Sequence, residues 1–512
     1  MIKEISKMPR NYLDIEKTIA ETGFFSEYLP PCFILDKKVF IYPPDEKCDL
    51  IPPVCFSMSR FNGNDARRNI FIPEIGAYMA TREFMRQEYI IKELIEFSEA
   101  GDASFSPILG KNDSIIRHEQ SYERFLLELD EISSDYFENI AKKIIRSFGA
   151  KYVLKLDISN CYSSFYVHMM PAILLGTEIT ETEYKKYIKN ADDTSIDPIY
   201  IKYRKLDSII RQQNLCRTNG LLAGTLYSKV IIESLLTRID KELQNQGIKH
   251  SRYVDDFEVY LYEYEEKRII SIFEKTLKRY GFSLNFEKTE LIEFPYYVAE
   301  NLEKLFLRKF NTKLDTSEVM ELFNSFLLLE KTGTKGAIRY LLKSVEKNHI
   351  ETTSPELFKS YLISILRNND RSLSKACSLL INDEDLLVLN SADIVLIIEL
   401  LSFHLRCEHD LEVIWLLYLL IQTNKVNAGD PVTSQVAHSH NELAQLLLLR
   451  KSLLNEASLL TICANATSWI LLYELYTSGS INENEFVDRL GLRKNTNMYK
   501  QFKRNNLHFV EL

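Results

Sequence analysis

Residues 251–262 read Ser-Arg-Tyr-Val-Asp-Asp-Phe-Glu-Val-Tyr-Leu-Tyr, with two adjacent carboxylates between two strand-like runs. Tyr253–Val254 and Phe257–Tyr262 are rich in aromatic and β-branched residues, which favour strands. The pattern therefore predicts a β-hairpin with Asp255 and Asp256 at its turn. Taken alone, the pair is most simply a turn, because Asp favours turns.

A second strand is predicted upstream, at Tyr152–Ile158 (YVLKLDI), where apolar residues alternate with others up to Asp157. Helical spacing follows at Thr225–Leu243 and again, after the hairpin, at Glu265–Tyr280. Strand, helix, hairpin and helix in this order predict an α+β layer with helices on one face of a sheet. If the two strand regions are neighbours, Asp157 meets the Asp pair at one edge.

Three converging carboxylates favour a metal site for phosphate chemistry. Carboxylate oxygens are hard ligands that suit Mg²⁺, which also binds substrate phosphates. Two such ions about 3.5–4 Å apart can stabilise the attacking and leaving oxygens of an in-line phosphoryl transfer. The three Asp residues therefore predict a site for two Mg²⁺ ions.

Further motifs surround these acids in a fixed order. They are Ala66–Pro73 (ARRNIFIP), Leu156–Tyr162 (LDISNCY), Gly220–Ser228 (GLLAGTLYS), Tyr253–Asp256 (YVDD) and Gly281–Thr289 (GFSLNFEKT). In these segments the chain resembles the reverse transcriptase family, over roughly residues 60–295. The resemblance implies a right-hand polymerase with fingers and palm, acting on deoxynucleoside triphosphates (dNTPs).

The resemblance also implies roles for single residues. Asp157 and Asp255 would hold the metals, with Asp256 as a weaker ligand or an orienting carboxylate. Tyr162, five residues after Asp157, would be a steric gate against the 2′-hydroxyl; its alternative is a core aromatic at a helix start. Lys288 would donate a proton to the leaving pyrophosphate, unless it is only a solvated lysine.

The dNTP would also meet residues of two other motifs. Arg67 and Arg68 would clamp the triphosphate, because a guanidinium suits phosphate oxygens; the alternative is an exposed basic pair. Gly224 belongs to the nucleotide-binding loop, which usually reads Pro-Gln-Gly in the family. Here Ala223 replaces the glutamine, and alanine has no hydrogen-bonding side chain. Faithful templated selection is therefore in doubt.

The composition changes near residue 300, before which lie twelve of the 14 prolines and eleven of the 16 glycines. We therefore expect a polymerase domain over residues 1–300 and an all-α, solenoid-like or bundled domain over 301–512. No fixed repeat length is visible. The helices are predicted, from their apolar spacing, at Glu318–Leu329, Ala337–Val345, Pro355–Leu366, Asp393–Leu405 and Leu411–Gln422.

Where the resemblance would imply a thumb that grips the duplex, predicted helices follow instead, and no sustained basic stripe runs through them. Together with matches such as Ser164–His168 (SFYVH), Thr218–Gly220 (TNG) and Gly333–Ala337 (GTKGA), this helical part resembles the abortive-infection (Abi) group of bacterial reverse transcriptases. The resemblance implies phage defence, homo-oligomers, and untemplated DNA synthesis primed by a protein hydroxyl, with single-stranded DNA left covalently attached. Open alternatives are RNA-templated synthesis, and an idle scaffold whose helices bind a phage or host protein.

Composition and charge bear on whether the protein binds nucleic acid over its whole surface and on where it is located. Hydrophobic residues are 46%, charged residues 26%, and the net charge is −9, which argues against a surface that grips nucleic acid everywhere. Eight cysteines without a CxxC pair, no apolar leader and no apolar run of about 20 residues predict a cytoplasmic protein without membrane contact.

Two histidine pairs attract attention as metal ligands, namely His438 with His440 and His404 with His409. Neither pair has a neighbouring cysteine or HExxH spacing. Surface histidines or satisfied core histidines are the preferred interpretation of both pairs.

Overall fold

The computed structural model describes residues 11–42, 44, 48–59, 67–109, 136–297, 302–309, 311, 313–348, 351–383 and 387–512. Ala66 of the predicted basic motif, and the first ten residues, lie outside this range.

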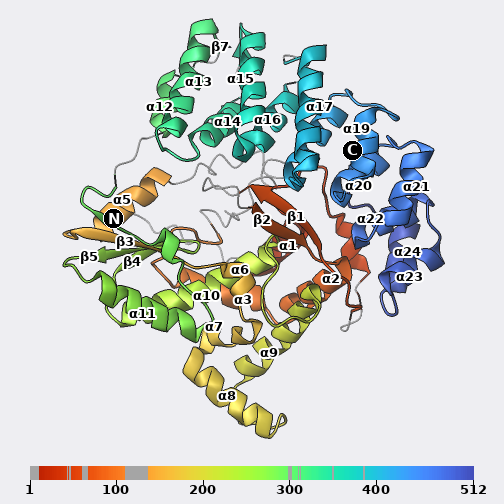
Figure 1. Cartoon of the computed structure of the whole chain (residues 1–512). Helices are drawn as coiled ribbons and strands as arrows, with labels where there is room; N and C mark the ends of the chain where they lie inside the picture. The colour runs from red at the N-terminus through yellow and green to blue at the C-terminus, as the bar shows by residue number, and fades with distance from the viewer. Residues whose placement is uncertain are drawn as a thin grey trace.

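The first half of the chain is built around a four-stranded antiparallel sheet (Figure 1). Its strand order is β4 (His250–Tyr253), β5 (Asp256–Leu261), β3 (Tyr152–Asp157) and β6 (Glu290–Glu293). The two strand regions predicted from the sequence are therefore neighbours. Their register pairs Leu156 with Phe257 and Asp157 with Asp256.

Two helices cover one face of this sheet, as expected for an α+β layer. They are α10 (Leu226–Asn245), whose N-cap is Thr225, and α11 (Glu266–Arg279). The rings of Phe257 and Phe273 meet edge to face at 5.4 Å and join sheet to helix. The opposite face carries a small separate apolar cluster, to which Val153 and Tyr260 contribute, because successive side chains of a strand point to opposite faces.

A two-stranded antiparallel sheet of β1 (Val54–Ser59) and β2 (Arg67–Ile72) lies between the main sheet and the C-terminal helices (Figure 1). β2 is fixed to the loop before α10 by a hydrogen bond from Phe71 N to Ala223 O, 2.8 Å. The other helices of this half are α1 (Tyr12–Thr22), α2 (Ile75–Gln87), α3 (Ile90–Glu99), α5 (Tyr136–Arg146), α6 (Cys161–Ser164), α7 (Ala172–Leu175), α8 (Thr177–Lys189) and α9 (Pro198–Ile210).

From residue 302 on, the described chain is helical except for a two-residue parallel pairing of β7 (Lys313–Leu314) with β8 (Glu351–Thr352). The helices form an arc along one side of the molecule (Figure 1). They are α12 (Leu302–Lys309), α13 (Thr316–Lys331), α14 (Ala337–Asn348), α15 (Pro355–Asn368), α16 (Asp370–Asn382), α17 (Ser391–Arg406), α18 (Asp410–Gln422), α19 (Pro431–Ala437), α20 (Glu442–Arg450), α21 (Glu456–Asn465), α22 (Trp469–Ser478), α23 (Glu483–Leu490) and α24 (Thr496–Arg504).

All five segments predicted to be helical in this half form helices; α14 and α15 start at the predicted residue, and α13, α17 and α18 start one or two residues earlier. The N-cap of α13 is Asp315, which forms a capping box with Glu318, and that of α17 is Asn390, paired in the same way with Asp393. Among the described residues, no helix combines the length and apolarity that crossing a bilayer requires.

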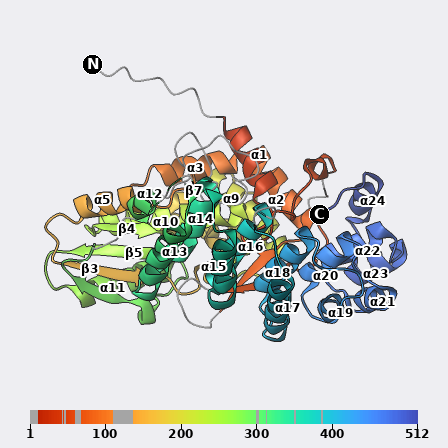
Figure 2. The same cartoon turned by 90° about the horizontal axis from the view of Figure 1, so that it is seen from above.

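The helical arc closes back on the start of the chain (Figure 2). Phe33 and Val510 form an antiparallel bridge, and the Tyr499 hydroxyl in α24 donates to Glu74, the N-cap of α2, at 2.6 Å. One continuous hydrophobic core includes residues of both halves. The helical part is therefore attached to the rest of the molecule at more than its sequence junction.

Candidate active site

Asp157, Asp255 and Asp256 come together at the end of β3 and the β4–β5 turn. A carboxylate oxygen of each lies within 4.8 Å of the other two. Asp157 is 5% exposed, whereas Asp256 faces solvent at the rim. The pairing of β3 with β5 produces this cluster, because it places Asp157 directly opposite Asp256.

The turn formed by Val254 and Asp255 has a strained backbone, and Asp256, predicted at this turn, is instead the first residue of β5. Val254 has φ +57°, in the left-handed region that β-branched residues avoid. Two contacts hold it there: Val254 N donates to Ser106 Oγ at 2.7 Å, and Val254 O accepts from Arg252 Nη1 at 2.8 Å. Such strain persists only where the surroundings impose it, and functional sites are where it is commonly found.

Arg252 in turn is anchored in a buried ionic network. Its side chain has no exposed surface, and its guanidinium donates to both carboxylates of α10 that face it, Glu233 and Asp240, at 2.8–3.1 Å. His250 also contacts Asp240, at 3.0 Å. The hairpin turn is thus connected to the helix beneath the sheet through one arginine.

Two residues of the segment Gly281–Thr289 reach Asp157. Asn285 Nδ2 donates to Asp157 Oδ2 at 3.0 Å, and Asn285 N donates to Asp157 O at 2.8 Å. Lys288 Nζ lies 3.0 Å from the same Oδ2. The structure therefore brings Lys288, which the sequence predicts as a site residue, to the acidic cluster. It also brings Asn285 of the same motif, for which the sequence predicts no role.

The close approach of the carboxylates affects their protonation. Burial and the neighbouring charge of Asp157 raise the pKa of Asp255, opposed by the positive charges of Arg68 and Lys288. Burial, a hydrogen bond with Asp157 and the charge of Asp255 raise the pKa of Asp256 to about 7. A divalent cation would relieve the same repulsion that a proton relieves here.

Arg67 and Arg68 are neighbours in β2 but have different surroundings. Arg68 is exposed, and its charge acts on Asp255. Arg67 instead forms an ion pair with Glu412 of α18 and donates from Nε to Ser57 Oγ at 3.2 Å. Of the predicted triphosphate clamp, the structure therefore places Arg68 toward the acidic cluster and Arg67 toward the helical arc.

Gly224 lies in the loop that precedes α10, and Tyr162 contacts the same loop from α6. Tyr162 is half-buried in α6, and its carbonyl accepts from Leu221 N at 2.9 Å. Gly224 has φ +134°, and an added Cβ would lie 2.7 Å from Phe71 O. Glycine is therefore required here by the close approach of β2, in addition to any contact with a nucleotide.

The donor set of the cluster suits magnesium. All three groups are carboxylates, and hard oxygen ligands of this kind are those that Mg²⁺ takes. Sequence reasoning missed the role of four residues that support the cluster without belonging to it, because no sequence pattern marks a buried residue as such a support. They are Ser106, Glu233, Asp240 and Arg252.

Residues 95–341 match the family described as "Reverse transcriptase (RNA-dependent DNA polymerase)". These residues form a reverse transcriptase domain. The match spans just under half of the chain and contains each predicted site residue except Arg67 and Arg68.

Solved structures of telomerase are also similar to the chain, at low identity. For telomerase from Candida albicans in complex with a TWJ fragment of telomeric RNA, identity is 14% and the TM-score 0.28, over 72% of this chain and 66% of that chain. For apo telomerase from Candida tropicalis, identity is 12% and the TM-score 0.29, over 75% of this chain and 67% of that chain. For telomerase from Candida tropicalis in complex with the TWJ fragment, identity is 13% and the TM-score 0.30, over 78% of this chain and 64% of that chain. This chain thus spans about two thirds of their length. No curated protein matches the chain.

Proposed function

We propose that this protein is a DNA polymerase that uses two Mg²⁺ ions to join deoxynucleotides and release pyrophosphate. The observation that carries the proposal is the meeting of Asp157, Asp255 and Asp256 within the reverse transcriptase domain. Two positively charged side chains, those of Lys288 and Arg68, act on the same cluster.

The positions of the acidic residues support the roles that the resemblance implies. Asp157 and Asp255 would hold the ions, and Asp256, at the exposed rim, would be the weaker ligand. Bound magnesium supplies charge stabilisation for the attacking and leaving oxygens. Arg252 and Ser106 keep the turn in the conformation that presents Asp255.

The remaining residues act on the nucleotide. A hydroxyl oxygen attacks the α-phosphorus, the bond to the pyrophosphate oxygen breaks, and the hydroxyl proton passes to solvent. Lys288 Nζ gives a proton to the departing pyrophosphate, and Arg68 binds its phosphate oxygens. Tyr162 stacks under the sugar and excludes a 2′-hydroxyl.

We further propose that the first hydroxyl belongs to the protein itself and that no template is read. The support is the resemblance to the Abi group and the alanine at position 223, which offers no side-chain hydrogen bond to an incoming nucleotide. The product is single-stranded DNA on a protein phosphodiester. Its synthesis serves abortive infection in the cytoplasm, and the helical arc serves oligomer formation or a phage or host partner.

The test is incubation of purified protein with labelled dNTPs and Mg²⁺ without nucleic acid, followed by denaturing electrophoresis. We expect label on the denatured protein, and mass analysis then identifies the primed residue. Asp255→Asn and Asp157→Asn should each lower incorporation about 100-fold or more, while Asp192→Asn, at an exposed site in the loop after α8, should not.

Other outcomes distinguish the alternatives. Label that appears only with an added primer and RNA template, and copies that template, would replace the untemplated proposal with conventional reverse transcription. Phage resistance that survives Asp255→Asn would favour a scaffold whose helices bind a phage or host protein.

A further inference from the structure

Two histidines and an aspartate meet in the helical arc, far in sequence from the reverse transcriptase motifs. Asp370 is the first residue of α16, His404 lies in the last turn of α17, and His409 is the N-cap of α18. One ligand atom from each lies within 4.8 Å of the other two. His404 is 1% exposed, and the other two are half-buried.

The tight turn between α17 and α18 makes the two imidazoles face one another. His409 N donates to His404 O at 3.0 Å, and Glu408 has φ +54°. The two Nδ1 atoms are 3.0 Å apart. Two nitrogens bound to one cation at about 2.05 Å are separated by about 2.9 Å in octahedral and about 3.3 Å in tetrahedral geometry, so the rings already have a separation that one cation can bridge.

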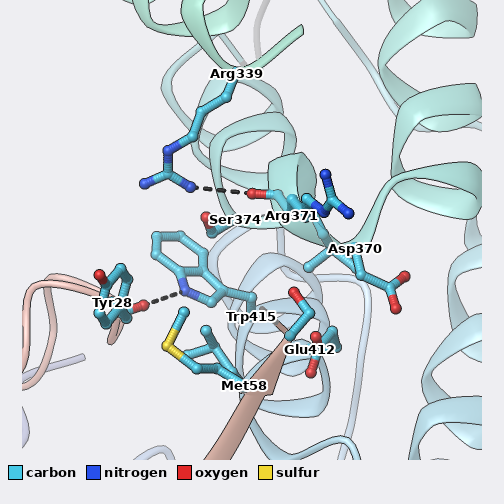
Figure 3. Close-up of a pocket in the computed structure, with 11 residues that line it drawn as sticks. Tyr28, Met58, Arg339, Asp370, Arg371, Ser374, Glu412 and Trp415 are labelled. Atoms are coloured by element: carbon cyan, nitrogen blue, oxygen red, sulfur yellow. Dashed lines mark hydrogen bonds between the residues drawn. The ribbon is translucent and has the colours of Figure 1, made fainter. Parts of the chain in front are cut away.

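A hydrogen bond between the rings does not satisfy the cluster. His404 Nε2 is buried and has no hydrogen-bond partner among the described residues. The same is true of Glu412 Oε1, in the first turn of α18. Asp370 and Glu412 both line the pocket of Figure 3, in which Trp415 of α18 donates from Nε1 to Tyr28 O. Buried nitrogen and oxygen atoms without partners among the described residues therefore adjoin the cluster.

We propose that Asp370, His404 and His409 bind one divalent transition-metal ion of the Zn²⁺ class. Two imidazole nitrogens and one carboxylate favour such an ion over Mg²⁺, which prefers oxygen ligands only. Water or Glu412 completes the coordination. The three ligands come from three helices, and Glu412 pairs with Arg67 of β2, so the ion ties α16, α17 and α18 together where the arc meets the β1–β2 sheet. This goes beyond the proposed polymerase function.

The experiment uses the full chain without a histidine tag, stripped with chelator and held in excess Mg²⁺ to occupy the carboxylate site. Titration with Zn²⁺ should show one site per chain by calorimetry and raise the melting temperature. Substitution with Co²⁺ should give the visible absorption bands of imidazole-bound cobalt. His409→Gln and Asp370→Asn should each weaken Zn²⁺ binding about 100-fold.

The matched control is His438→Gln with His440→Gln, an exposed pair in the same half of the chain, which should bind Zn²⁺ like the wild type. Wild-type protein that takes up no stoichiometric Zn²⁺ and gives no cobalt bands would overturn the proposal, whether or not the variants fold. So would unchanged affinity in a His409→Gln protein that melts cooperatively.

Discussion

Asp255 and Asp256 lie beside Asp157 at a distance where like charges oppose ionisation. Asp256 retains its proton up to about pH 7, because burial and both neighbours act in the same direction. The native state without metal thus binds a proton that the unfolded chain, with an ordinary aspartate, has already lost above about pH 4. The residues that would bind metal therefore reduce the stability of the metal-free protein.

This gives a prediction for stability. The raised pKa of Asp256 means that the free energy of unfolding of metal-free protein falls as the pH rises from about 4 to about 7, and that the loss is complete above. Asp256→Asn should therefore stabilise metal-free protein at pH 8 by about 1 kcal/mol, since the rim position is screened by solvent, and change little at pH 4.

The measurement is thermal unfolding of both proteins in chelator over this pH range. Excess Mg²⁺ should reduce the advantage of the variant at pH 8, because the ion stabilises only the wild-type cluster. A variant that is less stable than the wild type at pH 8 without metal would contradict the argument.

At the scale of the element, the β4–β5 hairpin depends on contacts that lie behind it. Val254 would not adopt φ +57° by its own preference. Ser106 and Arg252 impose this conformation from opposite directions, one on the backbone N–H and one on the carbonyl. The hairpin is thus positioned by the loop after α3 and by α10 together.

We therefore predict that Ser106→Ala lowers the rate of nucleotide incorporation about 10-fold through misplacement of Asp255, with a smaller effect on the KM for dNTP. The kinetic split and the Mg²⁺ dependence of the rate check this. Ser98→Ala is the control, because the Ser98 hydroxyl donates only to Ile95 O within α3. Equal effects of the two substitutions would exclude a positioning role.

Replacement of Arg252 should disturb the same hairpin more than replacement of Ser106. Arg252→Met leaves Glu233 and Asp240 buried without their partner, which costs about 3–5 kcal/mol. We expect a large fall in melting temperature, seen by calorimetry or circular dichroism. Adding Glu233→Gln and Asp240→Asn should recover part of this stability but not the activity, because the contact to Val254 O stays lost. Recovered activity would show that the network is structural only.

At the scale of the whole molecule, α18 and the end of the helical arc are held against the first half of the chain. In α18, Glu412 forms an ion pair with Arg67, and Trp415 Nε1 donates to Tyr28 O at 2.8 Å. The end of the chain then pairs with Phe33 and Glu74. The arc thus restrains β2, and with it the position of Arg68 near the acidic cluster.

The two neighbouring arginines should therefore respond differently to substitution. Arg67→Ala leaves the almost fully buried Glu412 carboxylate unpaired and should destabilise the protein by about 3 kcal/mol. Arg68→Ala should leave the melting temperature unchanged and raise the KM for dNTP about 10-fold, since it removes a charged hydrogen bond to phosphate.

Thermal unfolding and steady-state incorporation on both variants decide between these outcomes. In a double-mutant cycle, Arg67→Ala and Glu412→Gln should couple by about 1–3 kcal/mol. Loss of dNTP affinity of the same size in both arginine variants would mean that Arg67 also reaches the nucleotide.

Much of the acidic site could be predicted from the sequence, because it depends on local order. Alternation in Tyr152–Ile158 places Asp157 at a strand end, and of the Asp pair predicted at the hairpin turn, Asp255 lies in the turn whereas Asp256 starts β5. Helix spacing likewise located α10, α11 and five helices of the arc, with errors only at the caps. The motifs GFSLNFEKT and YVDD then pointed to Lys288 and to the reverse transcriptase family that residues 95–341 match.

Tertiary structure alone decided the rest. Nothing in the adjacent letters Arg67-Arg68 shows that one side chain meets α18, 345 positions away, while the other acts on Asp255. In the same way, His404 and His409 acquire Asp370 only when α16 packs against α18. Periodicity determines which residues share a face of one strand or helix, but partners distant in sequence are set by how those faces pack, and that depends on the whole core.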